Sequence, residues 1–289
     1  MPANSDRDLI LKLACPDRVG LVATLAKLME KHECFIASSR TFGDPVSGRF
    51  YARLVFRSAD NSGTPPALLA DMQTTGEALK AEWSIFEASK KIRSLLLVSK
   101  SDHCANTLLY AARRSELPIE IVGIVSNHAS MKENFSHWGL PWFDVPVTKD
   151  TKPAAEARLF DIIEETGAEL TVLARYMQIL SNDACRRLQG RCINIHHSFL
   201  PSFKGARPYH QAYARGVKVI GATAHYVTPD LDEGPIITQV TEPVDHAFTA
   251  QDLVATGRHL EGTALLRAVK AHAEHRVFEH DGRTVVFDH

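Results

Sequence analysis

The chain has 289 residues, with 33 basic and 34 acidic side chains and a formal net charge of −1. This near-neutral balance, without a long run of like charges, argues against a nucleic-acid-binding surface or a polybasic membrane anchor and favours a small neutral or anionic substrate. The N-terminus is polar, and no apolar run approaches the roughly 20 residues of a membrane-spanning helix. We therefore expect a cytoplasmic protein, and the length favours two domains over one.

The cysteines support the same compartment. Five of them, at positions 15, 34, 104, 185 and 192, form no CxxC pair. An odd number of scattered thiols suits a reducing environment rather than a disulfide framework, so we expect small buried hydrophobic side chains at these positions.

The first 88 residues predict one compact domain. Alternating and helical spacings of apolar residues indicate, in order, a strand at 9–14, a helix from Leu21 to Met29, strands at 34–42 and 48–56, a helix at 66–79 and a strand at 83–87. The order βαββαβ predicts a ferredoxin-like α+β sandwich in which helices cover one face of the sheet.

The loop after the first strand carries a specific resemblance. The string Cys15-Pro16-Asp17-Arg18-Val19-Gly20-Leu21-Val22 resembles the opening of an ACT domain, a regulatory module that senses amino acids. The resemblance implies a regulatory or assembly domain at 1–88, with Asp17, Gly20 and Leu21 at an amino-acid effector pocket. The alternative is that Gly20 only lets the loop close tightly on the helix. Such domains and open sheet edges commonly assemble in pairs, so we expect a homo-oligomer.

A short polar linker at 89–93 precedes a second domain at 94–289. The run Ser94-Leu95-Leu96-Leu97-Val98 is typical of a buried parallel strand. Helices and strands then alternate, which predicts a Rossmann-like doubly wound α/β sheet. The expected elements are a helix at 103–114, strands at 119–125 and 142–147, a helix at 152–166, a strand at 168–174, a helix at 182–188, a strand at 217–227, a helix at 249–272 and a terminal strand pair at 276–279 and 284–287.

The densest chemistry lies between Asn194 and Asp232. Residues 192–196 alternate, so Asn194 and His196 share one face of a strand, while His197 points away and makes the pair a poor zinc chelate; we expect no metal. An asparagine amide can donate to a developing oxyanion, a histidine can donate or move a proton, and Asp232 beside Gly234 can orient a nucleophile and manage protons. Each residue alone also has a structural explanation as a strand cap, a core histidine or an Asx-turn.

Together the motifs resemble the folate-dependent formyltransferases: Asn-Ile-His, then Ser-x-Leu-Pro-Ser-Phe-Lys-Gly, then Val-Thr-Pro-Asp-Leu-Asp-Glu-Gly-Pro-Ile-Ile. The resemblance implies that Asn194, His196 and Asp232 act on the formyl group of 10-formyltetrahydrofolate, a substrate, with no prosthetic group. His225 and Gly205 are possible supporting residues, although a lone strand histidine is more often structural. The residues implied in folate binding are Tyr176, Gln178, Ile179, Leu180, Val227, Thr228, Pro229 and Asp230; ordinary core packing is the alternative for Ile179 and Leu180.

The formyl acceptor is the remaining question. Glycinamide ribonucleotide formyltransferases carry a glycine-rich phosphate loop after their first strand, whereas this chain has Ser99-Lys100-Ser101-Asp102-His103-Cys104. Methionyl-tRNA formyltransferases add an RNA-binding domain, and this chain ends soon after Asp232. An N-terminal ACT-like domain joined to a formyltransferase-like domain resembles the formyltetrahydrofolate deformylases. We therefore expect water to be the nucleophile. The alternatives are formyl transfer to glycinamide ribonucleotide or another amine, and a non-catalytic amino-acid or folate sensor.

Overall fold

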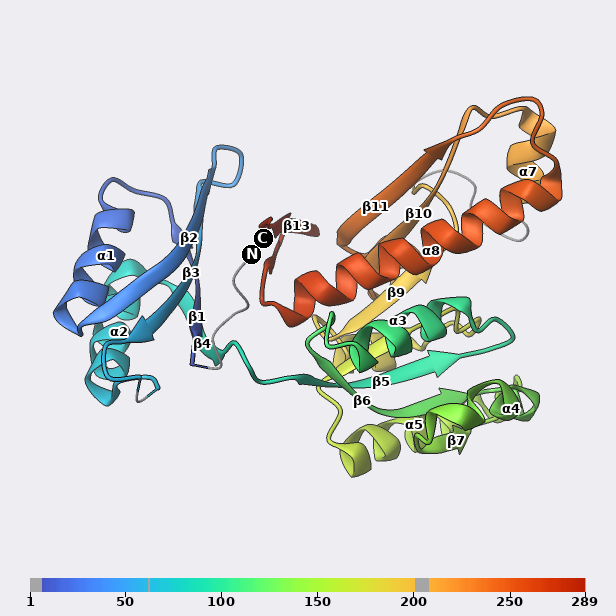
Figure 1. The fold of residues 1–289 in the computed structure, drawn as a ribbon, viewed down its shortest axis with the longest axis horizontal. Helices are drawn as coiled ribbons and strands as arrows, with labels where there is room; N and C mark the ends of the chain where they lie inside the picture. The colour runs from blue at the N-terminus through green and yellow to red at the C-terminus, as the bar shows by residue number, and fades with distance from the viewer. Residues whose placement is uncertain (1–6, 62, 201–207, 289) are drawn as a thin grey trace. The chain divides into compact units, whose positions relative to one another are not determined.

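The computed structural model describes residues 7–61, 63–200 and 208–288, which fall into two compact units. Unit 1 comprises the described residues up to Lys90, together with Glu274–Phe278 and the residues from Val286 on; unit 2 comprises Lys91–Ala273 and Glu279–Val285. The sequence predicted one domain over residues 94–289, whereas the C-terminal segment after Ala273 is divided between the two units. Figure 1 shows the elements of each unit.

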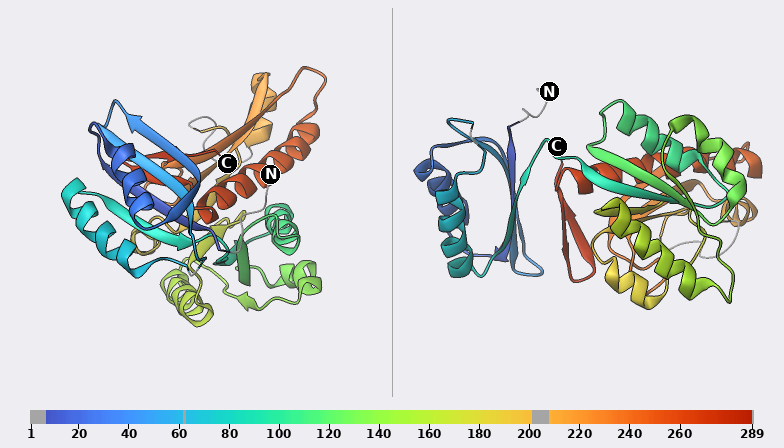
Figure 2. Two further views of the ribbon diagram at one scale, coloured as in Figure 1. Left: turned by 60° about the vertical axis from the view of Figure 1, so that its left-hand side comes forward. Right: turned by 90° about the horizontal axis from the view of Figure 1, so that it is seen from below.

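Unit 1 is a four-stranded antiparallel sheet with two helices on one face, as Figure 2 shows. The strand order is β2-β3-β1-β4. Its elements follow the predicted βαββαβ order, with most strands a residue or two longer than expected: β1 (Leu9–Pro16), α1 (Leu21–Lys31), β2 (Cys34–Asp44), β3 (Arg49–Ser58), α2 (Pro66–Leu79) and β4 (Glu82–Glu87).

Both faces of the central strands are buried, for two different reasons. One face packs against the apolar sides of α1 and α2, where Leu25, Met29 and Leu68 are buried with Leu11 and Leu13 of β1. The other face contacts the segment Glu274–Phe278 of the same unit, a contact that has several parts: Arg53 donates two hydrogen bonds to the carbonyl of Glu274 at 2.9 and 3.1 Å, Lys12 donates one to the carbonyl of Val277, and the rings of Tyr51 and Phe278 meet edge to face. Burial lowers the pKa of Arg53 to about 10.

Unit 2 is a three-layer α/β structure. Its elements are β5 (Ile92–Val98), α3 (His103–Arg113), β6 (Ile119–Ser126), the short helices η1 (Ala129–Met131), α4 (Lys132–Phe135) and η2 (Ser136–Trp138), β7 (Trp142–Asp144), α5 (Lys152–Thr166), β8 (Leu170–Leu173), α6 (Asn182–Arg187), β9 (Cys192–His196), α7 (Pro208–Arg215), β10 (Val219–Tyr226), β11 (Ile236–Pro243) and α8 (Ala250–Ala273). The strands β12 (Val277–His280) and β13 (Arg283–Val286) form a separate two-stranded sheet.

The sheet of unit 2 has seven strands in the order β11-β10-β9-β8-β5-β6-β7. Strands β7, β6, β5, β8 and β9 run parallel, as predicted, whereas β10 and β11 are antiparallel additions at one edge. Helix α8 crosses β9, β10 and β11 and packs beside α3 (Figure 1). The short helices, α7 and β11 were not predicted, and β7 ends at Asp144 rather than at residue 147.

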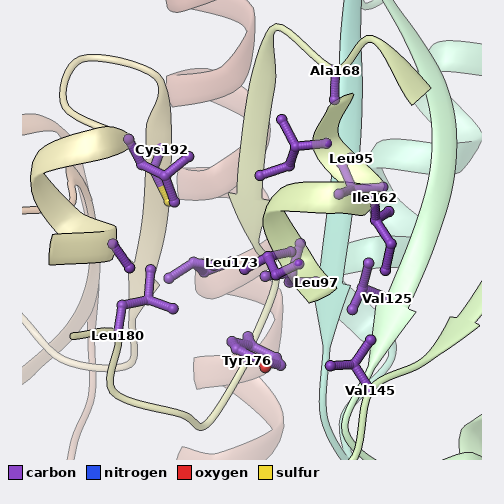
Figure 3. Close-up of a cluster of buried hydrophobic side chains, with 14 of the residues drawn as sticks. Leu95, Leu97, Val125, Val145, Ile162, Ala168, Leu173, Tyr176, Leu180 and Cys192 are labelled. Carbon is purple, nitrogen blue, oxygen red and sulfur yellow. The ribbon is translucent and has the colours of Figure 1, made fainter. Parts of the chain in front are cut away.

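The core of unit 2 fixes the strand ends that carry the polar motifs. Leu95 and Leu97 of β5 pack against α5, and the same cluster continues through Leu173 at the end of β8 to Tyr176 and Leu180 of the loop that follows, as Figure 3 shows. All five of these side chains are at least nine-tenths buried. A rigid apolar layer therefore supports the loop 174–180 at the carboxyl ends of the parallel strands, where open α/β sheets bind ligands.

Two predictions from composition concern the whole chain. Cys15, Cys104, Cys185 and Cys192 are buried, Cys34 is partly buried, and all five carry free thiols, as expected for small apolar side chains. Among the helices of the described ranges, none is long and apolar enough to cross a membrane.

Candidate active site

A cavity of about 330 Å³ opens at the ends of β8, β9 and β10 in unit 2. Its wall is formed by the loop after β8, the last residues of β9 and the loop after β10. Asn194, His196, His225 and Asp232 all line it. Folding therefore brings together an amide, two imidazoles and a carboxylate that are separated by up to 38 positions in the sequence.

Asn194 is held by a neighbour on the adjacent strand. It lies opposite His225 in the β9–β10 register, and its Nδ2 is 3.2 Å from Nε2 of His225. Nδ1 of His225 donates to the carbonyl of Tyr226 at 2.8 Å, so Nε2 is the acceptor, and burial lowers the pKa of His225 and keeps the ring neutral at pH 7. The second N–H of the Asn194 amide group is thereby oriented as a donor within the cavity wall.

The side chains of His196 and Asp232 lie within ion-pair distance of each other. Nδ1 of His196 lies 3.2 Å from Oδ1 of Asp232, and Nε2 of His196 lies 2.9 Å from the hydroxyl of Ser198. The imidazole is 6% exposed, and the carboxylate is 17% exposed. The hydrogen bond from His196 lowers the pKa of Asp232 against the opposing effect of partial burial. Asp232 is therefore an ionised, hydrogen-bonded carboxylate at neutral pH.

A strained loop directs Asp232 into the cavity. Its φ of 58° is in the left-handed region, which is uncommon for a residue with a side chain. Two residues later, a Cβ on Gly234 would collide with the carbonyl oxygen of Tyr226, because Tyr226 and Pro235 are joined by a backbone hydrogen bond of 3.0 Å. Glycine lets the loop fold back along β10, and this close return places Asp232 beside His196.

His197 also lines the cavity, although the strand alternation predicted that it points away. The reason is that β9 ends at His196, so the period-two rule does not extend to the next residue. Its Nδ1 is buried and has no hydrogen-bond partner among the described residues. Burial, followed by the charge of Arg175, lowers the pKa of His197 to about 4.

This shift makes a prediction about stability. The pKa of His197 is lower in the folded chain than the ordinary value of 6.5, so the unfolded chain binds more protons between pH 6.5 and 4. The buried, neutral His197 does not lower the unfolding free energy above pH 6.5. As the pH falls from 6.5 toward 4, the unfolding free energy decreases by up to about 3 kcal/mol, at 1.36 kcal/mol per pKa unit. In urea titrations, His197→Gln should weaken this pH dependence of the unfolding free energy; equal slopes for the variant and the parent chain would contradict the assignment.

The residues predicted to bind folate all lie along this one cavity. Tyr176 and Leu180 are also part of the core of unit 2, whereas Ile179 is 60% exposed. Their contact with folate stays a prediction. Gly205 lies outside the described residues. Sequence reasoning did not single out the role of Arg175 or Ser198, because an arginine in a loop and a serine after a strand carry no pattern of their own.

The predicted effector residues lie in unit 1, at the start of α1. Gly20 has φ of 92° and precedes the helix, which explains why glycine stands there. The backbone N–H of Asp17 donates to the carbonyl of Gly48 at 2.8 Å. Leu21 is 3% exposed and belongs to the core of the unit, so only its backbone could meet a ligand. Effector binding at this loop stays a prediction.

The sequence is similar to known proteins over nearly its whole length. Residues 92–269 match the Formyl transferase family. The chain is 45% identical to the formyltetrahydrofolate deformylase of Corynebacterium sp. strain P-1, with 96% of this chain and 97% of the relative covered. It is 40% identical to the formyltetrahydrofolate deformylase of Bacillus subtilis, with 99% and 95% covered. The similarity therefore spans both units.

Solved structures agree. The formyltetrahydrofolate deformylase of Burkholderia mallei has a TM-score of 0.92 and 48% identity, and covers 97% of this chain and 99% of its own. A glycinamide ribonucleotide transformylase from Symbiobacterium toebii has a TM-score of 0.64 and 30% identity, and covers only 69% of this chain, with 95% of its own. The similarity extends over nearly the full chain only for the formyltetrahydrofolate deformylases among these structures. The chain therefore belongs to the formyltetrahydrofolate deformylase family, hydrolases that convert 10-formyltetrahydrofolate to formate and tetrahydrofolate.

Proposed function

We propose that this chain hydrolyses 10-formyltetrahydrofolate, with Asn194, His196 and Asp232 as the catalytic residues. The observation that supports the proposal is the convergence of these three groups in one cavity, beside the loops 174–180 and 227–232. Apolar side chains of these loops suit the faces of a pterin ring, and their backbone groups suit its polar edge. The formyl group would then lie at the end of the cavity that holds the amide and the carboxylate.

The reaction follows from the charges of these groups. Ionised Asp232 orients a water molecule and takes its proton as the water oxygen bonds to the formyl carbon. Asn194 donates a hydrogen bond to the oxyanion of the tetrahedral intermediate, and His196, as an imidazolium, donates a second from Nε2. When the intermediate collapses, the bond from carbon to N10 breaks, N10 takes the proton that Asp232 accepted from water, and the formic acid that leaves gives its proton to solvent and becomes formate. His225 is a positioning residue that orients the Asn194 amide.

Two other functions are weaker on structural grounds. In a formyltransferase, an amine would replace water, but the loop before α3 places the carboxylate of Asp102, held by a hydrogen bond from Asn134, at the start of the helix. A phosphate at that point would meet a negative charge. A sensor without turnover would have no need for the alignment of Asn194, His196 and Asp232.

One assay separates the three functions: formate release from 10-formyltetrahydrofolate, with and without glycinamide ribonucleotide. Release without the amine supports hydrolysis. Release or transfer that requires the amine would support a formyltransferase, and tight folate binding without either product would support a sensor.

For unit 1 we propose an ACT-like domain, over residues 1–88, that binds an amino acid and takes part in a homo-oligomer. Its order of elements and the left-handed Gly20 before α1 support the first part. The second is supported by β2, an edge strand with Phe35 and Phe42 exposed by 61% and 42%. Thermal shifts across a panel of amino acids test the first, and sedimentation velocity tests the second; no shift, or a monomer, would reject the respective part.

We also propose that the protein works in the cytoplasm. Its five free thiols, four of them buried, suit a reducing compartment. Immunodetection in separated cell fractions tests this location.

A further inference from the structure

We propose that Arg175, held by the buried carboxylate of Glu261, is a specificity-determining residue that keeps amines away from the formyl group, so that water reacts. This inference rests on the hydrolysis proposed above. It starts from a polar cluster next to the catalytic residues that the proposed reaction does not use. The cluster consists of His103 at the start of α3, Arg175 after β8, Tyr209 in α7 and Glu261 in α8.

Glu261 is the centre of the cluster. It is 1% exposed, and both of its oxygens are engaged: Oε1 accepts from the hydroxyl of Tyr209 at 2.8 Å, and Oε2 lies 2.8 Å from Nε2 of His103 and 3.2 Å from Nε of Arg175. Burial by itself raises the pKa of Glu261, but the hydrogen bond from His103 and the charge of Arg175 outweigh it, and the net shift is downward. A buried, ionised carboxylate needs such partners.

The cluster is suited to hold an arginine rather than a metal ion. Side-chain atoms of His103, Cys104 and Glu261 are close enough together to suggest a cation site. However, the guanidinium of Arg175 already supplies a positive charge to Glu261. Burial also raises the pKa of the Cys104 thiol well above its usual value, which disfavours the thiolate that a metal would require.

The surrounding packing fixes the position of Glu261. A Cβ on Gly257, one helical turn earlier in α8, would collide with the ring of Tyr209, and one on Gly262 would press on Thr107 of α3. The two glycines therefore let α7 and α3 approach α8 closely on either side of Glu261. Ser99 anchors the loop that carries Arg175, because its hydroxyl accepts a hydrogen bond from the N–H of Met177 at 2.9 Å.

Arg175 forms part of the wall of the catalytic cavity. Its side chain and His197 line the cavity, whereas His103, Tyr209 and Glu261 do not. Its Nε is buried and makes no aligned hydrogen bond to the part of the chain that the structure describes, and its φ of 65° is left-handed, so the guanidinium is placed there at a conformational cost. A separate small cavity of about 30 Å³ lies between His197 and Tyr209.

The competing reaction defines what Arg175 prevents. In formyl transfer, an amine nitrogen bonds to the formyl carbon and loses a proton, while the carbon–N10 bond breaks and N10 gains a proton. The amine must bring its substituents to the same carbon that water attacks. Arg175, fixed by Glu261, lines the cavity that holds the catalytic residues, so its bulk and positive charge oppose the approach of a protonated amine to the formyl carbon, whereas water is smaller and uncharged.

The test uses the full chain and glycinamide as the amine probe. The ratio of formylglycinamide to formate is measured from ¹³C-formyl substrate by NMR, for the parent chain, Arg175→Gly and Glu261→Gln. Glycine is chosen because it adopts a φ of 65° without strain. We expect the ratio to rise by about tenfold or more in Arg175→Gly and by less in Glu261→Gln, in line with the loss of one steric and charge barrier. Arg158→Ala, which removes an exposed arginine paired with Glu165, is the control and should keep the ratio of the parent chain.

The outcomes separate this inference from the function on which it rests. A folded Arg175→Gly with an unchanged ratio, or one that loses both products, would overturn the inference while hydrolysis by the parent chain stands. A parent chain that releases no formate without glycinamide would overturn the proposed function itself. If Arg175→Gly fails to fold, Arg175→Lys, which keeps the charge but is shorter, serves the same test and should show a smaller rise.

Discussion

Asp232→Asn should lower the rate of formate release by about 10² to 10⁴-fold, the range expected when a general base is removed. Asparagine has nearly the same size and tolerates the left-handed backbone at this position, so the loop should keep its shape. The amide cannot take a proton from water, and it removes the negative charge that lies 3.2 Å from His196. The loss should therefore appear in kcat.

Folate binding provides the internal control for this variant. Tetrahydrofolate should bind Asp232→Asn about as tightly as it binds the parent chain, because the pterin contacts are proposed for other residues of the cavity. Asp161→Asn, an exposed aspartate in α5, is the matched substitution and should leave turnover intact. Near-normal turnover in Asp232→Asn would reject the assigned role.

Asn194→Ala should cost about 10² to 10³-fold in kcat, as does the removal of one oxyanion donor in other enzymes. The structure gives the reason: His225 accepts one N–H of the amide group at 3.2 Å and orients the other. Because this donor acts on charge that develops in the transition state, KM should change much less than kcat. Steady-state kinetics of formate release provide the measurement.

Two further variants sharpen this prediction. Asn194→Asp keeps the shape, removes the donor and adds a negative charge near Asp232, so it should be at least as slow as Asn194→Ala. Asn182→Ala, an exposed asparagine at the start of α6, should behave like the parent chain. A loss below about threefold in Asn194→Ala would show that the amide is not an oxyanion donor.

The sequence predicted most of the sheet because its strands are buried on both faces. Runs such as Leu95 to Val98 are apolar and buried throughout. Strand β11 escaped prediction because it is an edge strand that pairs only with β10 and exposes much of its length. Strand β7 was predicted too long because Pro146, which has no N–H to donate to a neighbouring strand, follows Val145.

Long-range contacts were the other gap. Arg53 and Glu274 are 221 positions apart, and no local pattern predicts that the segment 274–278 packs against the sheet of unit 1. The same is true of Arg175 and Glu261, since a single sequence does not show which glutamate of a helix is buried. Asn194, His196 and Asp232 could be predicted as a set because their flanking strings resemble those of a family, whereas the contact between Asn194 and His225 depends on the pairing of two strands.

The most direct test of the central proposal is the origin of the oxygen in formate. Hydrolysis in H₂¹⁸O, without any amine, adds one water oxygen to the formyl carbon for each carbon–N10 bond that breaks. We therefore predict formate with one ¹⁸O atom per turnover, by mass spectrometry, at a rate that glycinamide ribonucleotide does not increase. Formate without the label, or product that forms only when the amine is present, would contradict attack by water at this site.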